Sequence, residues 1–350
     1  MRKDWEYKKL GEVCDILDSQ RKPVTKKDRK KGIYPYYGAT GIQDFVDNYI
    51  FDGRYVLVGE DGAKWSANEK CAYIIEGKTW INNHAHVLST KNMVIDSFLT
   101  YYLNFSDLDS YISGAIIRKL TQSSLKSIPI PLPPKPTQLA IVAELDKINE
   151  LIQLKKQQLK DYDQLAQSIF YEMFGDPVEN EKGWEVKKLG EVCDLKAGKA
   201  IKANELSNDN PYPCYGGNGI RGYINRCSHV ESSPIIGRQG AYCGTVNFAE
   251  APFYATEHAV VVRGKQDMQI KWLYYTLVNL KLTRYAKGQA QPGIAVSSLN
   301  ELVIIPLPPL PLQQQFAARI EAIERQKQQV SETIKDLETL LASRMQYWFD

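Results

Sequence analysis

The chain has 350 residues, of which 43% are apolar and 24% are charged, and its formal net charge is +3. This composition excludes an intrinsically disordered chain, and the length allows two domains of ordinary size. Because the charge is almost balanced, any nucleic-acid surface must be a local feature. No signal peptide and no run of roughly 20 apolar residues is found, so we expect a cytoplasmic protein without a membrane span.

Residues 1–136 predict an α+β globule with a mixed β-sheet. Short apolar runs such as Tyr55–Gly59 alternate with Gly, Asn, Asp and Pro, which is typical of strands joined by turns. A helical stretch from Ile95 to Leu103 interrupts them. The loop at 18–31 holds seven basic and two acidic residues, a pattern that attracts phosphate but that also occurs on ordinary solvated surfaces.

Residues 137–181 predict a long helix and a short link. Neither Gly nor Pro occurs from Thr137 to Phe174, and a helix of this length measures about 57 Å. Its apolar residues alternate between spacings of four and three, which indicates a coiled-coil seam. The seam contains Ile141, Leu145, Ile148, Ile152, Leu159 and Tyr162 and continues through Ala166, Ile169 and Met173.

Residues 182–311 repeat the first globule. Trp5–Asp15 returns as Trp184–Asp194 with ten of eleven positions identical, and Ile130–Pro134 returns as Ile305–Pro309. The segments between them recur in the same order, while the offset drifts only from 179 to 174. The chain therefore contains two copies of one unit.

Residues 312–350 predict a second long helix whose seam has the same phase as the first. Its members are Phe316, Ile320, Ile323, Val330, Ile334 and Leu337, and the series ends with Leu341, Arg344 and Trp348. The link before residue 182 is too short for the chain to turn back. Pairing of the seams would therefore make an antiparallel coiled coil that separates two globules related by a pseudo-two-fold axis. The alternative is a coiled coil between two chains.

Four patterns that resemble catalytic or metal sites have simpler explanations. Ala72–Thr79 fits a relaxed phosphate loop, but bulky residues would line the cradle, so a strand is favoured. Asn210–Pro213 suits a turn better than a methyltransferase motif, and the Glu6–Lys8 pair suits a surface strand. His84 and His86 lack a third ligand and are interpreted as structural. We expect no catalytic residue and no metal site, and we expect the six separated cysteines to be reduced.

The glycine-flanked turns of the two copies share a frame but differ at their ends. Asp61–Trp65 in the first copy corresponds to Arg238–Tyr242 in the second, and the 113–120 loop corresponds to the loop at 288–293. Arg pairs with guanine and Gln with adenine through two hydrogen bonds in the major groove. A common frame with different polar ends is what two readers of different DNA sequences need.

Together these motifs resemble the specificity-subunit family of type I restriction-modification enzymes over essentially the whole chain. The resemblance rests on the Trp-x-x-x-x-Leu-Gly-Glu-Val start of each copy, on Tyr37–Ile42, on Val58–Ala63, and on the Ile-Pro-Leu-Pro-Pro segment before each long helix. Each motif alone is weak, but their order, repeated twice, is specific. The chain departs from the family in having little sequence beyond the second helix.

The resemblance implies that each globule is a target-recognition domain that reads one half of a split, asymmetric site in double-stranded DNA. The helices would fix the gap and dock two methylation subunits, and the full complex would add two restriction subunits. S-adenosylmethionine, ATP and Mg²⁺ would belong to those partners, and this chain would hold no cofactor.

From loop position and chemistry we predict two groups of DNA-binding residues. The phosphate contacts are Lys26, Lys27, Arg29 and Lys30 in the first copy, and Lys199 and Lys202 in the second. The residues at the groove are Lys64, Trp65, Arg118 and Lys119 in the first copy, and Arg221, Arg238, Gln239, Gln289 and Gln291 in the second.

Two other classes of protein remain open at this point. A stand-alone, dimeric, sequence-specific DNA-binding protein would use the helices to dimerise and would bind without any partner subunit. A nuclease or methyltransferase in its own right would be active as a pure chain, but the motifs above do not favour it.

Overall fold

The computed structural model describes residues 5–116, 118–265, 267–288 and 291–350. Contacts divide the chain into two compact units: a first unit of residues 1–156 with 332–350, and a second unit of residues 157–331. Each unit therefore contains one globule and part of both long helices, whereas the sequence alone suggests four consecutive segments. Among the helices described, none is long and apolar enough to cross a membrane.

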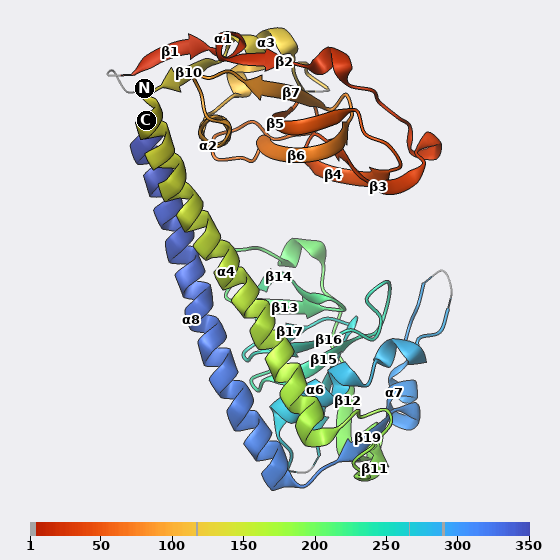
Figure 1. The fold of residues 1–350 in the computed structure, drawn as a ribbon. Coiled ribbons are helices and arrows are strands. Elements are labelled where there is room, and N and C mark those ends of the chain that lie inside the picture. The colour runs from red at the N-terminus through yellow and green to blue at the C-terminus, as the bar shows by residue number, and fades with distance from the viewer. Residues whose placement is uncertain (1–4, 117, 266, 289–290) are drawn as a thin grey trace. The chain divides into compact units, whose positions relative to one another are not determined.

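The first unit is built on one six-stranded mixed sheet, which confirms the predicted α+β fold (Figure 1). Its strands in spatial order are β2 (Cys14–Ile16), β7 (Ala85–Thr90), β5 (Phe51–Gly59), β6 (Ala72–Ile81), β3 (Lys31–Gly38) and β4 (Gly41–Val46). The β3–β6 pair is parallel, and the other pairs are antiparallel. Helix α2 (Asp96–Phe105) covers β5 and β6 and buries Phe98, Leu99 and Leu103.

A small second layer joins the start of the first globule to its end. Strand β1 (Glu6–Lys9) pairs antiparallel with β10 (Pro129–Leu132), and α1 (Leu10–Val13) packs against α3 (Gln122–Ser127). The remaining elements are η1 (Asp18–Gln20), η2 (Lys26–Asp28), η3 (Asp109–Tyr111), β8 (Ile112–Ser113) and β9 (Lys119–Leu120). The chain therefore leaves the globule beside the point where it entered and continues into the first long helix.

The second unit repeats this plan with its sheet divided in two. One sheet has the order β12 (Cys193–Ala197), β18 (Ala259–Gly264), β15 (Ser233–Gly237) and β16 (Val246–Ala249), and the other β14 (Gly219–Ile224), β13 (Tyr212–Gly216) and β17 (Tyr254–Ala255). Strands β16 and β17 take the place of the continuous β6. Pro252 lies in the interruption, where it has no N–H to donate to a strand ladder.

The other elements of the second unit follow the first in the same order. Strand β11 (Glu185–Lys188) pairs with β19 (Ile304–Leu307), and α5 (Leu189–Val192) packs against α7 (Val296–Leu302). Helix α6 (Ile270–Asn279) corresponds to α2, and the short helices are η4 (Ala203–Glu205) and η5 (Leu282–Tyr285). The repeat seen in the sequence is therefore also a repeat of structure, apart from the divided sheet and from η1 and the β8–β9 pair, which have no named counterpart among the described residues of the second unit.

The two long helices, α4 (Lys135–Phe174) and α8 (Leu310–Phe349), run antiparallel within each unit. In the first unit Glu144 contacts Arg344 and Lys156 contacts Glu338. In the second unit Asp163 contacts Lys327, and the ring of Phe170 lies 5.7 Å from that of Phe316. Helix α4 begins two residues before the predicted start because a proline, Pro136, is tolerated in the first turn.

Most of the predicted seam is confirmed. Ile141, Leu145, Ile148, Ile152, Phe316, Ile320, Ile323, Val330 and Ile334 are buried, while Leu159, Tyr162 and Leu337 are half-buried. The prediction is wrong at the end of each helix, where the buried residues are Phe170 and Phe174 in α4, and Met345 and Phe349 in α8. There each helix packs on its globule as well as on its partner helix, for example Phe349 on Phe98.

Candidate nucleic-acid interface

In each unit two loops that are far apart in the sequence meet at one end of the globule. In the first unit the backbone N–H of Leu120 donates to the carbonyl of Glu60 at 2.8 Å. In the second unit the N–H of Ile294 donates to the carbonyl of Arg238 at 2.9 Å. The structure therefore brings together the two variable turns of each copy, on the same backbone frame.

The basic loop of the first unit divides into free and engaged side chains. Lys26, Lys27 and Lys30 are exposed and form no salt bridge with the described residues, so they are available for phosphate. Arg29 differs, since its guanidinium lies 4.2 Å from the ring centre of Tyr36 and 3.2 Å from Asp44. Arg29 therefore helps to hold the loop in place, unlike the three lysines, and its phosphate contact stays a prediction.

Trp65 was expected at the groove, but it belongs to the core. Its side chain is 3% exposed and its indole N–H donates to the carbonyl of Gly59 at 3.0 Å. An aromatic residue beside a glycine turn can either face solvent or close the turn from below, and the sequence does not distinguish the two. The guanidinium of Arg118 lies 5.9 Å from the Trp65 ring, so the core residue supports a surface residue.

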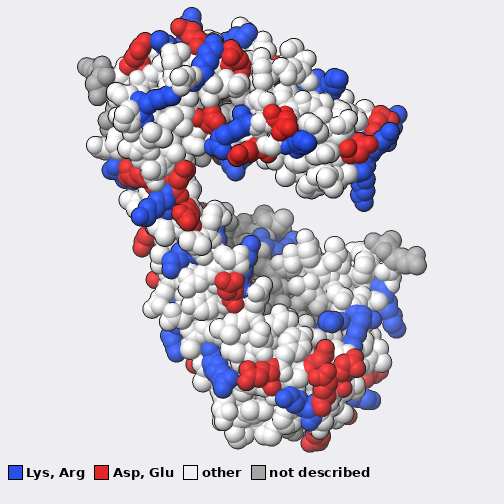
Figure 2. Space-filling model, in the orientation of Figure 1, with Lys and Arg blue, Asp and Glu red and all other residues white. Residues whose placement is uncertain are grey.

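The three remaining groove residues of the first unit are engaged in ion pairs; Lys64 and Arg118 are exposed and Lys119 is half-buried. These pairs are Lys64 with Glu69 at 3.3 Å, Arg118 with Asp109 at 2.6 Å, and Lys119 with Glu60 at 2.7 Å. The first two pairs are exposed and contribute about 0–1 kcal/mol each, so DNA can replace their acidic partner at little cost. The third differs, because Glu60 is buried and depends on Lys119 for part of its compensation. Figure 2 agrees with this picture, since Lys and Arg alternate with Asp and Glu on the visible face of the first unit.

A charge network that sequence reasoning missed lies beneath these loops. Arg21 donates to Glu60 at 2.5 Å and approaches Asp18 at 3.5 Å, while Asp18 accepts from the ring of His86 at 2.6 Å. All four side chains are at most 12% exposed. The sequence gives no signal for it beyond the residue types, because His86 is 68 positions from Asp18.

The same cluster offers three groups with the geometry of a metal site, namely Asp18, Glu60 and His86. A metal needs a ring nitrogen with a free lone pair. Both nitrogens of His86 instead face acceptors, Nδ1 the Asp18 carboxylate and Nε2 the carbonyl of Leu120 at 2.8 Å. Arg21 and Lys119 already occupy Glu60. The cluster is therefore interpreted as an internal charge network, with His86 in a structural role.

The network fixes the ionisation of its carboxyl groups. Burial alone would raise the pKa of Asp18, but the hydrogen bond and charge of His86 and the N–H of Val87 outweigh burial and lower it. Burial likewise opposes ionisation of Glu60, but its bonds to Lys119 and Arg21 lower the pKa below the usual value. Both carboxylates stay charged near neutrality and hold the loop ends in place.

The second unit has a cleft of about 460 Å³ at the corresponding end. It is lined by Gly217, Asn218, Ile220, Arg221, Gln239, Gly240, Tyr242, His258 and Gln291. Three of the predicted readers, Arg221, Gln239 and Gln291, thus lie together and exposed. Arg238 adjoins them, half-buried, and Gln289 lies outside the described residues. The predicted phosphate contacts Lys199 and Lys202 are exposed.

The charge at the loop end is reversed between the units. Arg238 stands where the first unit has Glu60, and Gln239 stands where it has Asp61. The Nε of Arg238 is buried without a hydrogen-bond partner, and neither Arg238 nor Arg221 forms a salt bridge with the described residues. The second unit therefore presents uncompensated donors where the first presents paired charges.

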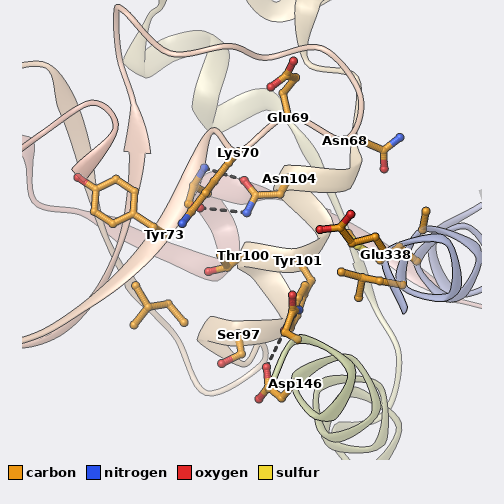
Figure 3. A pocket seen from close by; sticks show the side chains of 16 residues that line it. Asn68, Glu69, Lys70, Tyr73, Ser97, Thr100, Tyr101, Asn104, Asp146 and Glu338 are labelled. Atoms are coloured by element: carbon orange, nitrogen blue, oxygen red, sulfur yellow. Dashed lines mark hydrogen bonds between the residues drawn. The ribbon is translucent and has the colours of Figure 1, made fainter. Parts of the chain in front are cut away.

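A cavity of about 620 Å³ lies elsewhere in the first unit, and its lining residues support the fold (Figure 3). Asn104 holds the start of β6 through hydrogen bonds to Cys71 and Ala72, and Tyr101 donates to Asp146 at 2.6 Å. Burial, together with that bond, raises the pKa of Tyr101. Carboxylates outnumber the single lysine among the lining residues, which disfavours phosphate.

The remaining sequence patterns also have structural explanations. Residues 72–79 lie in β6, which confirms a strand and excludes a phosphate loop, although the strand continues to Ile81 instead of turning. Asn210 and Pro211 precede β13, as a turn requires. Glu6 and Lys8 form a surface pair at 3.2 Å on β1.

Two similar units that share a helix pair and differ at their loop ends define a duplicated recognition protein. The family model for the type I restriction modification DNA specificity domain matches residues 2–161 and again residues 181–339. The chain therefore belongs to the type I restriction-modification specificity-subunit family, as its sequence motifs indicate, and recognition of DNA is the function of that family's domain.

Individual relatives agree with the family model. A Haemophilus influenzae protein provisionally named a type I restriction enzyme specificity subunit is 28% identical over 346 residues, covering 93% of this chain and 89% of the relative. The EcoprrI specificity subunit of Escherichia coli is 37% identical over 258 residues, covering 69% and 59%. The crystal structure of the Mycoplasma genitalium S subunit has the same fold, with a TM-score of 0.64 at 15% identity and 99% and 96% coverage.

Proposed function

We propose that this chain is the non-catalytic, sequence-reading subunit of a cytoplasmic type I restriction-modification complex. Each unit reads one half of a split, asymmetric site in double-stranded DNA. The observation that carries the proposal is the loop end of each unit, where one backbone frame holds the buried Glu60 and the half-buried Asp61 in one copy, and the half-buried Arg238 and the exposed Gln239 in the other. Two loop ends with the same backbone arrangement but different hydrogen-bonding groups would read half-sites of different base sequence.

The phosphate contacts of the proposal are the exposed basic side chains beside these loops. Lys26, Lys27 and Lys30 serve the first unit, and Lys199 and Lys202 serve the second. Phosphate contacts set orientation and most of the salt dependence, whereas the loop ends supply the sequence preference. Lys64 and Arg118 reach DNA by exchanging their exposed acidic partners for it, whereas Lys119 stays on Glu60 and lies beside the DNA.

The partners of the proposal are two methylation subunits and, in the complete enzyme, two restriction subunits. Helices α4 and α8 dock the methylation subunits and fix the gap between the half-sites. S-adenosylmethionine, ATP and Mg²⁺ are bound by those partners. The chemistry then takes place on an adenine that the methylation subunits flip out of the duplex.

Co-purification with the neighbouring methyltransferase polypeptide, followed by mapping of methylated adenines, tests the proposal. We expect a complex with two methylation subunits per specificity chain that modifies one split motif. Site-specific binding by the chain alone, without association, would instead support a stand-alone dimeric DNA-binding protein. Methylation or cleavage by the pure chain would show that it is itself an enzyme.

A further inference from the structure

The edge hairpin of the first unit contains a β-bulge that isolates one polar residue. In the β3–β4 pair Tyr36 lies opposite Asp44 and Tyr37 lies opposite Ile42, so Gln43 between them has no partner in the ladder. A bulge takes one residue out of the pairing and changes the direction of its side chain. Gln43 is exposed, and β4 is the edge strand of its sheet.

The edge hairpin of the second unit has the same bulge at the same place. Cys214 lies opposite Gly222 and Tyr215 lies opposite Ile220, which leaves Arg221 unpaired. Arg221 is exposed and lies in the cleft with Gln239 and Gln291. Among the described residues that line the cleft, none is acidic. The two bulge residues therefore correspond in structure but differ in chemistry.

A glycine seats each bulge side chain. A Cβ added to Gly38 would overlap the amide of Gln43, and a Cβ added to Gly216 would overlap the aliphatic stem of Arg221. Neither glycine has a positive φ, so its backbone is accessible to alanine. Each glycine is therefore needed for the space that it leaves to the neighbouring side chain. This space lets Gln43 and Arg221 lie directly against the hairpin backbone.

The hydrogen bonds of Asn82 determine which way the Gln43 amide faces. Asn82 is 2% exposed, and its Oδ1 accepts from the backbone N–H of His84 at 2.8 Å, so its NH₂ group donates to Gln43 Oε1 at 3.1 Å. Gln43 keeps its own NH₂ group and a second lone pair on Oε1 for a ligand. In the second unit the buried position of Asn82 is taken by Thr256, which suits Arg221 because a guanidinium has no acceptor.

We propose that the bulge position is a base-reading position of both units, at which Gln43 recognises adenine and Arg221 recognises guanine. This inference rests on the proposed function and assigns one base of each half-site. Gln offers adenine a donor and an acceptor side by side, and Arg offers two donors to O6 and N7 of guanine. Gly38, Gly216 and Asn82 are positioning residues in this scheme, because they act through the reader beside them.

Nucleotide analogues test the two contacts one at a time. The complex with its methylation subunits is titrated with DNA that carries the mapped motif, with 7-deazaguanine or 7-deazaadenine replacing each purine in turn. We expect one guanine of one half-site to lose affinity on N7 removal in the native protein but not in Arg221→Ala. We expect one adenine of the other half-site to behave in the same way with Gln43→Ala. Discrimination at each position falls by roughly 5- to 100-fold.

Two further variants test the proposal by a change of specificity, which loss of the fold cannot produce. Gln43→Arg combined with Asn82→Thr copies the second unit, and we expect it to change that adenine of the motif to guanine. Gly38→Ala displaces Gln43, and we expect it to weaken discrimination in that half-site while the preference in the other half-site is kept. Asn92→Ala, at an exposed amide residue of the first unit that lies outside the loop ends and the long helices, is the matched control and leaves the motif unchanged.

Three results would separate the possible failures. An intact split motif that neither alanine variant alters would overturn the inference alone. An Arg221→Ala loss that is equal for all sequences, with the salt slope reduced by about one, would show a phosphate contact and would also overturn it. The absence of any split motif with the native complex would overturn the proposed function itself.

Discussion

The aromatic side chain of Phe349, at the end of α8, packs into the core of the first unit. It is 6% exposed, and its ring centre lies 5.5 Å from that of Phe98 and 5.7 Å from those of Tyr102 and Phe105. A buried Phe removes about 200 Å² from water, which at about 25 cal/mol per Å² gives an upper value near 5 kcal/mol. We expect Phe349→Ala to lower the free energy of unfolding of the first unit by about 4 kcal/mol.

Hydrogen exchange measured by mass spectrometry at increasing urea concentration locates this loss, because it reports each unit separately. Peptides from 5–116 should exchange at lower urea in the variant, while peptides from 182–265 keep their protection. Leu340→Ala, at a residue 45% exposed on the same helix, is the control and should cost about 0.5 kcal/mol or less. A loss below about 1 kcal/mol for Phe349→Ala, or one shared equally by both units, would refute the packing argument.

Three further predictions follow from charge and burial. Replacing the three free lysines of the basic loop by Gln should reduce the slope of log Kobs against log[salt] by about 2 to 3, as measured by DNA titration, and an unchanged slope would remove the loop from the interface. The lowered pKa values of Asp18 and Glu60 mean that the native carboxylates bind protons less readily than the unfolded ones. The stability that the two carboxylates contribute is therefore present above about pH 4 and is lost as pH falls through the folded pKa values. The urea midpoint of unfolding should fall over that pH range. It should fall less in a variant that carries Asp18→Asn and Glu60→Gln. Burial raises the pKa of Cys14 and of Cys193 to about 12, so iodoacetamide at pH 8 should label Cys227 first, and early labelling of either buried thiol would contradict the core described above.

The parts of the fold that the sequence predicts are those with a period or a repeat. The four-three spacing of apolar residues predicts both long helices and most of their seam, because one face of a helix recurs every 3.6 residues. The duplication aligns the strands of one copy with those of the other. The seam prediction is wrong at Phe170 and Met345, because their burial depends on the globule that covers them and not on the period of the helix.

The site is predicted less well because its side chains are arranged by partners far apart in the sequence. Arg29 looks like a free side chain until Asp44 and Tyr36 are placed beside it, and Trp65 looks like a groove residue until the core closes over it. Gln43 has a signal that sequence comparison could have used, since it aligns with Arg221 across the repeat. The bulge and the glycine that single it out appear only in three dimensions.

The hydrogen-bond requirements of buried backbone groups explain why the two units share a frame but differ at their loop ends. Gln138 is 1% exposed, donates to the carbonyls of Met93 and Pro133 and accepts from the N–H of Ile95. Gln313 is 4% exposed, donates to the carbonyl of Pro308 and accepts from the N–H of Gln269. Replacing either would leave buried backbone groups unpaired, at about 1–3 kcal/mol each. The exposed Arg221 forms no hydrogen bond to a buried group among the described residues, and Gln43 accepts only from the side chain of the buried Asn82, whose place Thr256 takes in the second unit. A change at an exposed position costs within about 0.5 kcal/mol when no buried group loses its partner. The residues proposed to read the bases can therefore differ between the two units without loss of the fold. Such a difference is what two units would need in order to read two different half-sites.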